Sequence, residues 1–305
     1  MHILPLVFGL GIFTVISAVA ESPVGITHSV FVAGAETAIL SEKGEVLWKY
    51  PAATRDGFVL PDGHVLLALS KNKEYPGGAV VEVTRENQAV FVCKGTQVEV
   101  NTAQALPNGR ILLTEAGPNP RVLEVDRSGK IVTEVALQAQ PGNPHMQTRM
   151  TRRLANGNYL VPQVMERVVR EYTPAGKIVW EYQSPALPKE CSPFAAIRLP
   201  DGHTLVTQTR GTRVDEVDAD GKIVWELTGA DLPTPLLNHP TAAQRLPNGN
   251  TVISSYGAAE NQVKLFEVTR DKQVVWTMAL PWKHGIHEFQ VLDTNGTPLA
   301  APPLK

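Results

Sequence analysis

Leu106-Pro107-Asn108-Gly109 belongs to a phrase that returns about every 46 residues along the chain. Its other copies are Leu60-Pro61-Asp62-Gly63, Leu154-Ala155-Asn156-Gly157, Leu199-Pro200-Asp201-Gly202, Leu246-Pro247-Asn248-Gly249 and a weaker one, Leu292-Asp293-Thr294-Asn295-Gly296. The six leucines lie 46, 48, 45, 47 and 46 residues apart. A period of this length in β-rich sequence is typical of the blades of a β-propeller.

One repeat shows how the phrase is used. Residues 102–106 predict a short first strand, and Pro107-Asn108-Gly109 predicts the turn after it, because Asn-Gly supplies the positive φ of a two-residue hairpin. Apolar residues then predict strands at 111–114, 122–125 and 130–135, separated by loops rich in Gly, Pro, Asn and Asp. Each repeat is therefore expected to be a blade of four antiparallel strands, and the fold class is all-β.

A large aromatic residue marks the last strand of most repeats. The fourth position after the turn glycine holds Trp48, Trp180 and Trp225, and the matching positions of the other repeats hold Phe91, Thr133 and Trp276. Such side chains have enough apolar area to fill the wedge between neighbouring blades. We interpret them as packing groups rather than as a platform for a ligand.

The two ends of the chain are expected to share one blade. The first unit, with strands expected at 29–32, 37–40 and 45–50, lacks an innermost strand, and residues 286–292 form an orphan strand that can supply it. This predicts a six-bladed β-propeller, closed by the C-terminal strand completing the N-terminal blade, which removes exposed sheet edges. The propeller is expected to span residues 21–296, and residues 297–305 to form a loosely ordered tail.

The first twenty residues predict a secretory signal peptide. Residues 3–16 form an apolar run too short to span a bilayer comfortably, and Ala18-Val19-Ala20 resembles the small-residue motif of a cleavage site. We expect residues 1–20 to be removed and the mature chain, with no transmembrane span, to be exported to the periplasm or the cell exterior. Cys93 and Cys191 fall on opposite sides of a six-fold ring, so no disulfide between them is expected.

Loop lengths predict which face of the ring binds a ligand. The connections between first and second strands, and between third and fourth strands, are short in every repeat. The other two connections vary in length, as at 138–147, 184–193, 230–240 and 256–262. Variable loops on a rigid scaffold usually carry binding residues, so function is expected at this loop-rich face and at its central mouth.

Polar residues from several repeats are expected around this mouth. The ligand-binding candidates are Arg55, Asp56, Asn101, His145, Arg149, His239, His284, His287 and Glu288. They could bind an anion, hold a metal or supply a general acid or base, or they could satisfy loop backbones around a wet channel. His284 and His287 have a spacing that resembles a metal site, whereas His64 and His203 stand beside hairpin turns and are expected at the surface.

The repeats resemble those of the PQQ-like, or quinoprotein-like, β-propeller group. The resemblance lies in Asp220-Gly221-Lys222-Ile223-Val224-Trp225-Glu226 and Ala175-Gly176-Lys177-Ile178-Val179-Trp180-Glu181, with the Leu-Pro-Asn-Gly phrases, and covers nearly all of the mature chain. Quinoprotein dehydrogenases of this group have eight blades and an adjacent cysteine pair against the quinone. This chain has six expected blades and no adjacent cysteines, so we expect neither PQQ nor any other cofactor.

A shorter stretch is similar to bacterial arylsulfotransferases, six-bladed propellers whose channel histidines transfer a sulfuryl group. His239-Pro240 before a first strand and His287-Glu288-Phe289 before the closing strand carry this resemblance. It implies a transferase in which His239 or His287 acts as nucleophile or acid/base, with His145 as a further catalytic candidate. Arg55 or Arg149 would stabilise the developing negative charge.

Our preferred hypothesis is an exported, monomeric propeller that binds a small molecule, a glycan or a protein through its loop-rich face and is not an enzyme. Group transfer of the arylsulfotransferase type is the alternative, and quinone-dependent dehydrogenation is not expected. The formal net charge of −2 gives no basic field, so nucleic acid is not expected as a partner.

Overall fold

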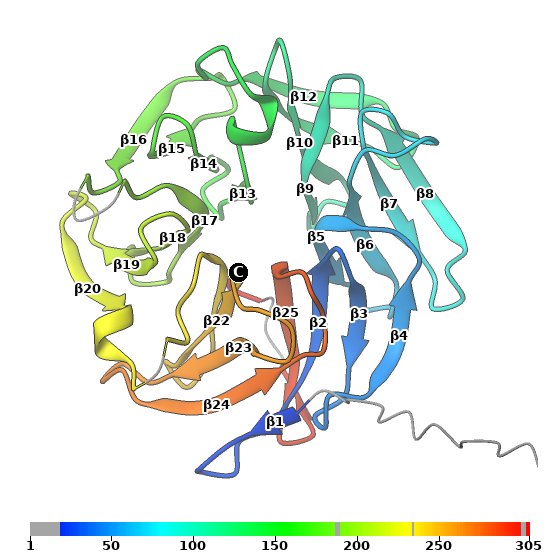
Figure 1. Cartoon of the computed structure of the whole chain (residues 1–305). Helices are drawn as coiled ribbons and strands as arrows, with labels where there is room; N and C mark the ends of the chain where they lie inside the picture. Colours follow the sequence, from blue (N-terminus) through cyan, green and yellow to red (C-terminus); the bar gives the residue numbers. More distant parts are fainter. Residues whose placement is uncertain (1–18, 187–189, 234, 300–302) are drawn as a thin grey trace, which may run out of the picture.

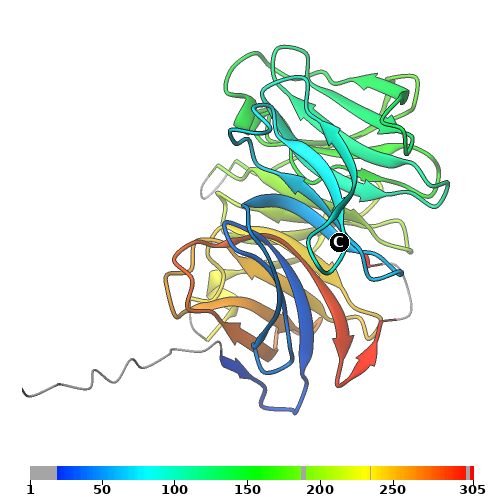
Figure 2. The same cartoon turned by 90° about the vertical axis from the view of Figure 1, so that its right-hand side faces the viewer.

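Six antiparallel sheets stand around a central axis and form a closed six-bladed β-propeller (Figure 1). The structure is a computed structural model, and it describes residues 19–186, 190–233, 235–299 and 303–305. Figure 2 shows the ring from the side. Two single turns of 3-10 helix, η1 (Pro144–Met146) and η2 (Gly229–Asp231), lie in connections between blades. The all-β, six-bladed fold expected from the repeat is confirmed.

Blades 2 to 6 each take four consecutive strands, of which the first lies nearest the axis. Blade 2 contains β5 (Thr54–Val59), β6 (Val65–Leu69), β7 (Ala79–Val83) and β8 (Ala89–Lys94). Blade 3 contains β9 (Glu99–Ala105), β10 (Ile111–Ala116), β11 (Arg121–Val125) and β12 (Ile131–Ala136). Blade 4 contains β13 (Arg152–Arg153), β14 (Tyr159–Gln163), β15 (Val168–Tyr172) and β16 (Ile178–Gln183). Blade 5 contains β17 (Pro193–Arg198), β18 (Thr204–Gln208), β19 (Arg213–Val217) and β20 (Ile223–Thr228). Blade 6 contains β21 (Pro240–Arg245), β22 (Thr251–Ser255), β23 (Val263–Val268) and β24 (Val274–Ala279).

Blade 1 is assembled from both ends of the chain. Its outer strands are β2 (His28–Gly34), β3 (Thr37–Leu40) and β4 (Val46–Tyr50), and its innermost strand is β25 (Ile286–Thr294). β25 pairs with β2 along its whole length, from Ile286 opposite Gly34 to Thr294 opposite His28. A short strand, β26 (Thr297–Pro298), folds back on β25. The predicted closure of the ring is therefore confirmed.

The N-terminal residues add a strand that the repeat does not predict. β1 (Val19–Glu21) pairs with the outer edge of blade 6, with Ala20 opposite Met278 of β24. The expected cleavage site between Ala20 and Glu21 falls inside this strand, and residues 1–18 of the expected signal peptide lie outside the described residues. Among the described residues, no helix has the length and hydropathy needed to cross a bilayer. Cys93 and Cys191 are not joined by a disulfide.

The turns of the five full copies of the phrase differ from the expected two-residue hairpin, which only the weaker copy forms, at Asn295-Gly296 between β25 and β26. In blade 3, Gly109 N donates to Leu106 O at 2.9 Å and Leu106 N donates to Arg110 O at 2.9 Å. Pro107, Asn108 and Gly109 therefore form a three-residue loop in which Gly109, with a φ of 79°, takes the left-handed conformation. A type I turn followed by a left-handed glycine has this geometry. In these five turns only the glycine, and not the residue before it, takes a positive φ.

The aromatic residues of the outermost strands join neighbouring blades. Trp180 Nε1 donates to Ala219 O of blade 5 at 2.8 Å, and Trp225 Nε1 donates to Arg270 O of blade 6 at 2.8 Å. Trp276 is fully buried. Their interpretation as packing groups is confirmed, since each of these side chains stabilises an interface within the ring.

A buried glutamate on the third strand joins each of five blades to the next one. Each glutamate side chain is paired with an arginine or, at one interface, a histidine of the following blade. The pairs are Glu82 with Arg127, Glu124 with Arg153, Glu171 with Arg198, Glu216 with Arg245 and Glu267 with His28. In blade 1 the same position holds Ile39, which packs with Val65 and Leu67 of blade 2.

The Glu267–His28 pair predicts how acid acts on the closing interface. Burial alone would raise the pKa of Glu267, but hydrogen bonds from His28, at 2.6 Å, and Asn250 outweigh it and hold the pKa below 4.5. A folded pKa below the unfolded one adds stability that is present above about pH 4.5 and is lost as the pH falls through the folded value. Glu267→Gln should lower the unfolding free energy by about 1.5–3 kcal/mol at pH 7, where a charged hydrogen bond is lost.

Urea unfolding at pH 7, 4 and 3 measures this effect. The difference between the wild type and Glu267→Gln should shrink as the pH falls. The matched control is Glu45→Gln, at an exposed residue of blade 1, which should change little at any pH. A constant difference from pH 7 to pH 3 would contradict the assignment.

The expectation of a loosely ordered tail is wrong for the last described residues. Leu304 O accepts a hydrogen bond from Arg245 N at 3.1 Å, at the end of β21 that leads into the tight turn. Lys305 is 3% exposed, and its Nζ donates to Gly57 O at 2.8 Å. The buried carboxylates of Asp56 and Glu288 attract this ammonium group. The amino-acid composition of the tail does not reveal this attraction.

Candidate binding site at the channel mouth

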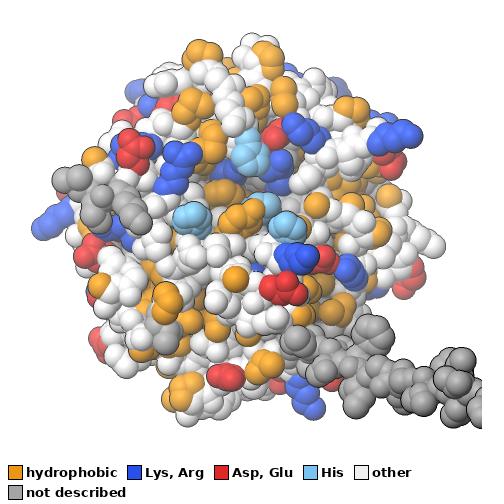
Figure 3. Space-filling view, in the orientation of Figure 1, with side chains coloured by type: hydrophobic (Ala, Val, Ile, Leu, Met, Phe, Trp, Pro, Cys, Tyr) orange, Lys and Arg blue, Asp and Glu red, His pale blue; other side chains and the backbone are white. Residues whose placement is uncertain are grey.

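Side chains from blades 1 to 6 meet where the innermost strands reach the loop-rich face. We call this set the mouth cluster. It consists of Arg55, Glu99, Asn101, His145, Arg149, Phe194, Tyr256 and His287. Figure 3 shows histidine, lysine and arginine side chains gathered around the centre of this face. The strands fix most of these residues, while η1 carries His145 and the loop after β22 carries Tyr256.

Glu99 connects the cations of the mouth cluster. Arg55 Nη2 lies 3.2 Å from Glu99 Oε1, and His145 Nδ1 lies 3.2 Å from Glu99 Oε2. Arg149 Nη1 is 3.9 Å from the same carboxylate. Burial alone would raise the pKa of Glu99, but His145, Arg55 and Arg149 outweigh it and keep the pKa below its ordinary value. One carboxylate therefore serves two arginines and a histidine.

Arg149 is a buried cation with incomplete charge compensation. Its Nη1 donates to Asn101 Oδ1 at 2.8 Å, its Nη2 donates to His145 O, and the residue is 3% exposed. Burial, together with the positive charge of Arg55, lowers the pKa of Arg149 to about 9. The lowered pKa means that the surroundings do not fully repay the cost of burying this charge.

His287 presents a neutral imidazole beside these arginines. Its ring stacks on Tyr256, with centroids 5.0 Å apart, and lies parallel to Phe194 at 6.2 Å. Burial and the positive charges of Arg149 and Arg55 lower the pKa of His287 to about 3. Its Nδ1 is buried and has no hydrogen-bond partner among the described residues. Such an atom is free to bind a ligand.

A second set of charged residues lies closer to the tight-turn face of the ring. We call Asp56, Arg152, Glu288 and Lys305 the floor cluster. Arg152 contacts Asp56 at 2.7 Å and Glu288 at 3.1 Å, and Lys305 Nζ lies 3.6 Å from Glu288 Oε1. Asp56 also accepts hydrogen bonds from the backbone of Gly57 and Ala103. These side chains satisfy one another, so the floor cluster is a structural ion network.

The predicted site residues thus separate into three groups. Arg55, Asn101, His145, Arg149 and His287 come together in the mouth cluster. Asp56 and Glu288 lie one position further along their strands and belong to the floor cluster. His239 and His284 are exposed, and within the described residues no hydrogen bond or ion pair joins them to either cluster.

Sequence reasoning missed several members of the two clusters. Glu99 shares a strand face with Asn101, so strand alternation could have found it. Arg152 is one of two adjacent arginines, and no pattern separates it from Arg153. Lys305 lies in the tail and carries no signal in the sequence. Phe194 is the second residue of β17 and Tyr256 stands in a variable connection, and spacing predicts no partner for either.

Two clusters on the tight-turn face have the composition of a metal site. Asp62, His64 and Glu82 form one of them and Asp201, His203 and Glu216 the other, with ligand atoms within 4.8 Å of one another. Both glutamates already bind arginines of the next blade. Other blades bond Arg110, Asn158 or Asn250 to a glutamate at the same position. The same glutamate position accepts a hydrogen bond from an arginine or an amide N–H in these blades, so the contact is a packing feature and we assign no metal here.

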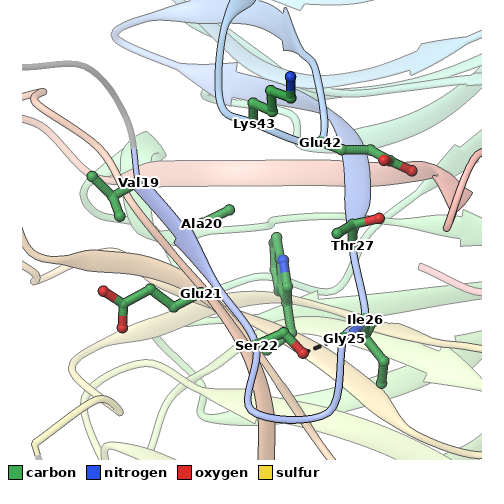
Figure 4. A pocket seen from close by; sticks show the side chains of 10 residues that line it. Val19, Ala20, Glu21, Ser22, Gly25, Ile26, Thr27, Glu42 and Lys43 are labelled. Atoms are coloured by element: carbon green, nitrogen blue, oxygen red, sulfur yellow. Dashed lines mark hydrogen bonds between the residues drawn. The ribbon is translucent and has the colours of Figure 1, made fainter.

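A surface pocket of about 390 Å³ lies away from the axis, between β1 and the turn after β3. Figure 4 shows the segment from Val19 to Thr27 looping over it, with Glu42 and Lys43 on the opposite side. Ser22 Oγ holds this loop by accepting from Ile26 N at 2.8 Å. The pocket has no set of converging, unpartnered polar atoms, so the mouth cluster remains the candidate site.

Comparison with known proteins supports the propeller fold. No protein-family model and no curated protein matches the sequence. A Bacteroides caccae protein of unknown function has a similar structure, with a TM-score of 0.75 and 22% identity over 90% of this chain and 100% of that one. Streptogramin B lyase gives a TM-score of 0.59 at 14% identity, covering 85% and 87% of the two chains. Virginiamycin B lyase from Staphylococcus aureus gives 0.57 at 14% identity, covering 87% and 99%. At these identities the likeness concerns the propeller fold alone.

Proposed function

We propose that this protein is an exported, monomeric PQQ-like propeller that binds a small molecule at its mouth cluster. The observation that supports this most is the buried, unpartnered Nδ1 of His287 beside two incompletely compensated arginines. Buried polar atoms are usually hydrogen-bonded to protein, water or a bound group. Asn101 and Arg149 are buried, so a flat protein surface would not reach them, and this favours a small molecule over a protein or a glycan.

A thermal-shift screen of small anions, sugars and amino acids tests this proposal. At least one compound should raise the melting temperature of the wild type, because a ligand that binds only the folded state stabilises it. The increase should disappear in Arg149→Met and persist in Arg210→Met, which makes the same change at an exposed residue of the loop-rich face. If no compound shows this dependence on Arg149, the mouth cluster is not a binding site.

Group transfer is the second candidate function, and the neutral state of His287 is the observation that favours it. A neutral imidazole can act as a nucleophile without first losing a proton. However, an efficient general base has a pKa near the working pH, and the pKa of His287 lies far below it. This comparison makes binding the preferred function.

Turnover of 4-nitrophenyl sulfate with a phenol as acceptor tests the transferase hypothesis. The transferase hypothesis requires activity that is abolished by His287→Ala and retained by His284→Ala. His284 is an exposed histidine in the connection before β25. Activity that survives replacement of both His239 and His287 would eliminate this candidate. Neither proposal includes a metal or another cofactor. Metal analysis of protein purified without added ions tests whether a metal is bound.

A further inference from the structure

The mouth cluster has more positive than negative charge. Arg55 and Arg149 carry two positive charges, Glu99 carries one negative charge, and His287 is neutral. Counted by side chains, the floor cluster supplies no counter-charge, because Asp56 and Glu288 face Arg152 and Lys305 in equal numbers. Transfer of a proton from Lys305 to Glu288 would neutralise both side chains and leave the net charge of the floor cluster unchanged. Among the buried side chains of the described residues, one positive charge at the mouth is therefore without a partner.

The unpartnered polar atoms of the mouth are suited to an oxyanion. Among the described residues, Arg55 Nε is buried without an acceptor, and His287 Nδ1 is buried without a hydrogen-bond partner. A guanidinium group presents N–H donors in a plane that matches a carboxylate. The hydrogen bond of the His287 ring to the backbone of Thr54 uses the single proton of the neutral imidazole, so Nδ1 is an acceptor and the arginines are the donors to an anion.

Aromatic rings lie beside these donors. Tyr256 and His287 stack with an interplanar angle of 22°, and Phe194 and His287 with an angle of 2°. The Arg149 guanidinium lies 5.4 Å from the Phe194 ring centroid, so the rings and the positive charge are neighbours. Tyr256 and Phe194 are both partly exposed. Parallel ring faces of this kind favour a flat partner.

We infer that the ligand of the mouth cluster is a small planar monoanion, an aromatic carboxylate whose charge meets Arg55 and Arg149 and whose ring packs against Tyr256 and Phe194. This inference rests on the binding function proposed above. It adds a ligand class, and this assignment can be disproved while the mouth cluster remains a binding site.

Titration calorimetry with three probes of similar size tests the inference. The probes are 2-naphthoate, the neutral planar 2-naphthamide and the charged, non-planar decahydro-2-naphthoate. The wild type should bind 2-naphthoate at least tenfold more tightly than either of the others. Arg149→Met should weaken binding of 2-naphthoate by about 10–100-fold, the loss expected for a charged hydrogen bond. Arg210→Met should bind it as the wild type does.

The outcomes separate the ligand class from the site. Equal binding of the amide and the carboxylate, both weakened by Arg149→Met, would overturn the anion but keep the mouth as a binding site. Equal binding of the two carboxylates would overturn the planar ring. Binding of 2-naphthoate that does not change in Arg149→Met would overturn the assignment of the ligand to the mouth cluster. If Arg149→Met does not fold, as judged by circular dichroism, Arg55→Met provides the same comparison at a residue nearer the surface.

Discussion

A chain that ends at Gly285 should lose the cooperative thermal unfolding of the intact protein. The deletion removes β25, so the seven residues of β2 lose their partner strand along the whole inner edge of blade 1. It also removes Ile286, Phe289 and Val291, which are at most 1% exposed in the intact ring. An open ring with an unpaired central strand would expose both apolar surface and backbone groups. Circular dichroism and size-exclusion chromatography should show a broad melt or aggregation.

A single substitution gives a graded form of this test. Phe289→Ala should lower the unfolding free energy by about 3–5 kcal/mol, the usual cost of truncating a buried phenylalanine. Leu47→Ala, on the outermost strand of the same blade, removes a side chain that is 62% exposed, and it should cost less than about 0.5 kcal/mol. An unchanged melting temperature after deletion of β25 would mean that this strand does not close the ring.

Asp56→Asn should cost about 3–5 kcal/mol, because it leaves buried cations without their partner. Arg152 binds both carboxylate oxygens of Asp56, at 2.7 Å and 3.1 Å, and Lys305 Nζ lies 4.0 Å away. Phe58, whose ring centroid is 3.9 Å from Lys305 Nζ, cannot replace a full negative charge. Equilibrium unfolding in urea at pH 7 measures the loss.

The matched control is Asp62→Asn, which makes the same change in the turn of the same blade. Asp62 is exposed, and its Oδ1 accepts from His64 N at 3.0 Å, a bond that asparagine can keep. It should change stability by less than about 0.5 kcal/mol. Adding Lys305→Met to Asp56→Asn should restore part of the loss, since the floor cluster becomes neutral again. Equal effects of Asp56→Asn and Asp62→Asn would show that the floor cluster is not a buried ion network.

Local signals predicted the blades because each blade is built from local contacts. The glycine of the turn and the aromatic residue on the last strand belong to the same repeat, so a period of about 46 residues shows them directly. The position of β25 was also predictable, because an unpaired strand at each end requires a partner. β1 was missed because its partner β24 already completes a blade of four strands.

The site was less predictable because its members are far apart in the sequence. Placing Arg55 beside Glu99 depends on the register of two different blades, and β5 and β9 both contain register shifts near these residues. His239 and His284 precede innermost strands, yet they point into solvent, because being near a mouth does not fix the direction of a loop side chain. The burial of Lys305 depends on Asp56 and Glu288, which come from two different blades.

The isoleucine at the blade 1–blade 2 interface determines how salt acts on the ring. At the other five interfaces a carboxylate faces an arginine or, at one of them, a histidine, and dissolved ions weaken attractions between charged partners, most strongly for those nearest the solvent. Ile39 packs against Val65 and Leu67 instead, and sulfate strengthens apolar contacts of this kind. Concentrated sulfate should therefore tighten this interface most, next to the blade that β2 and β25 share.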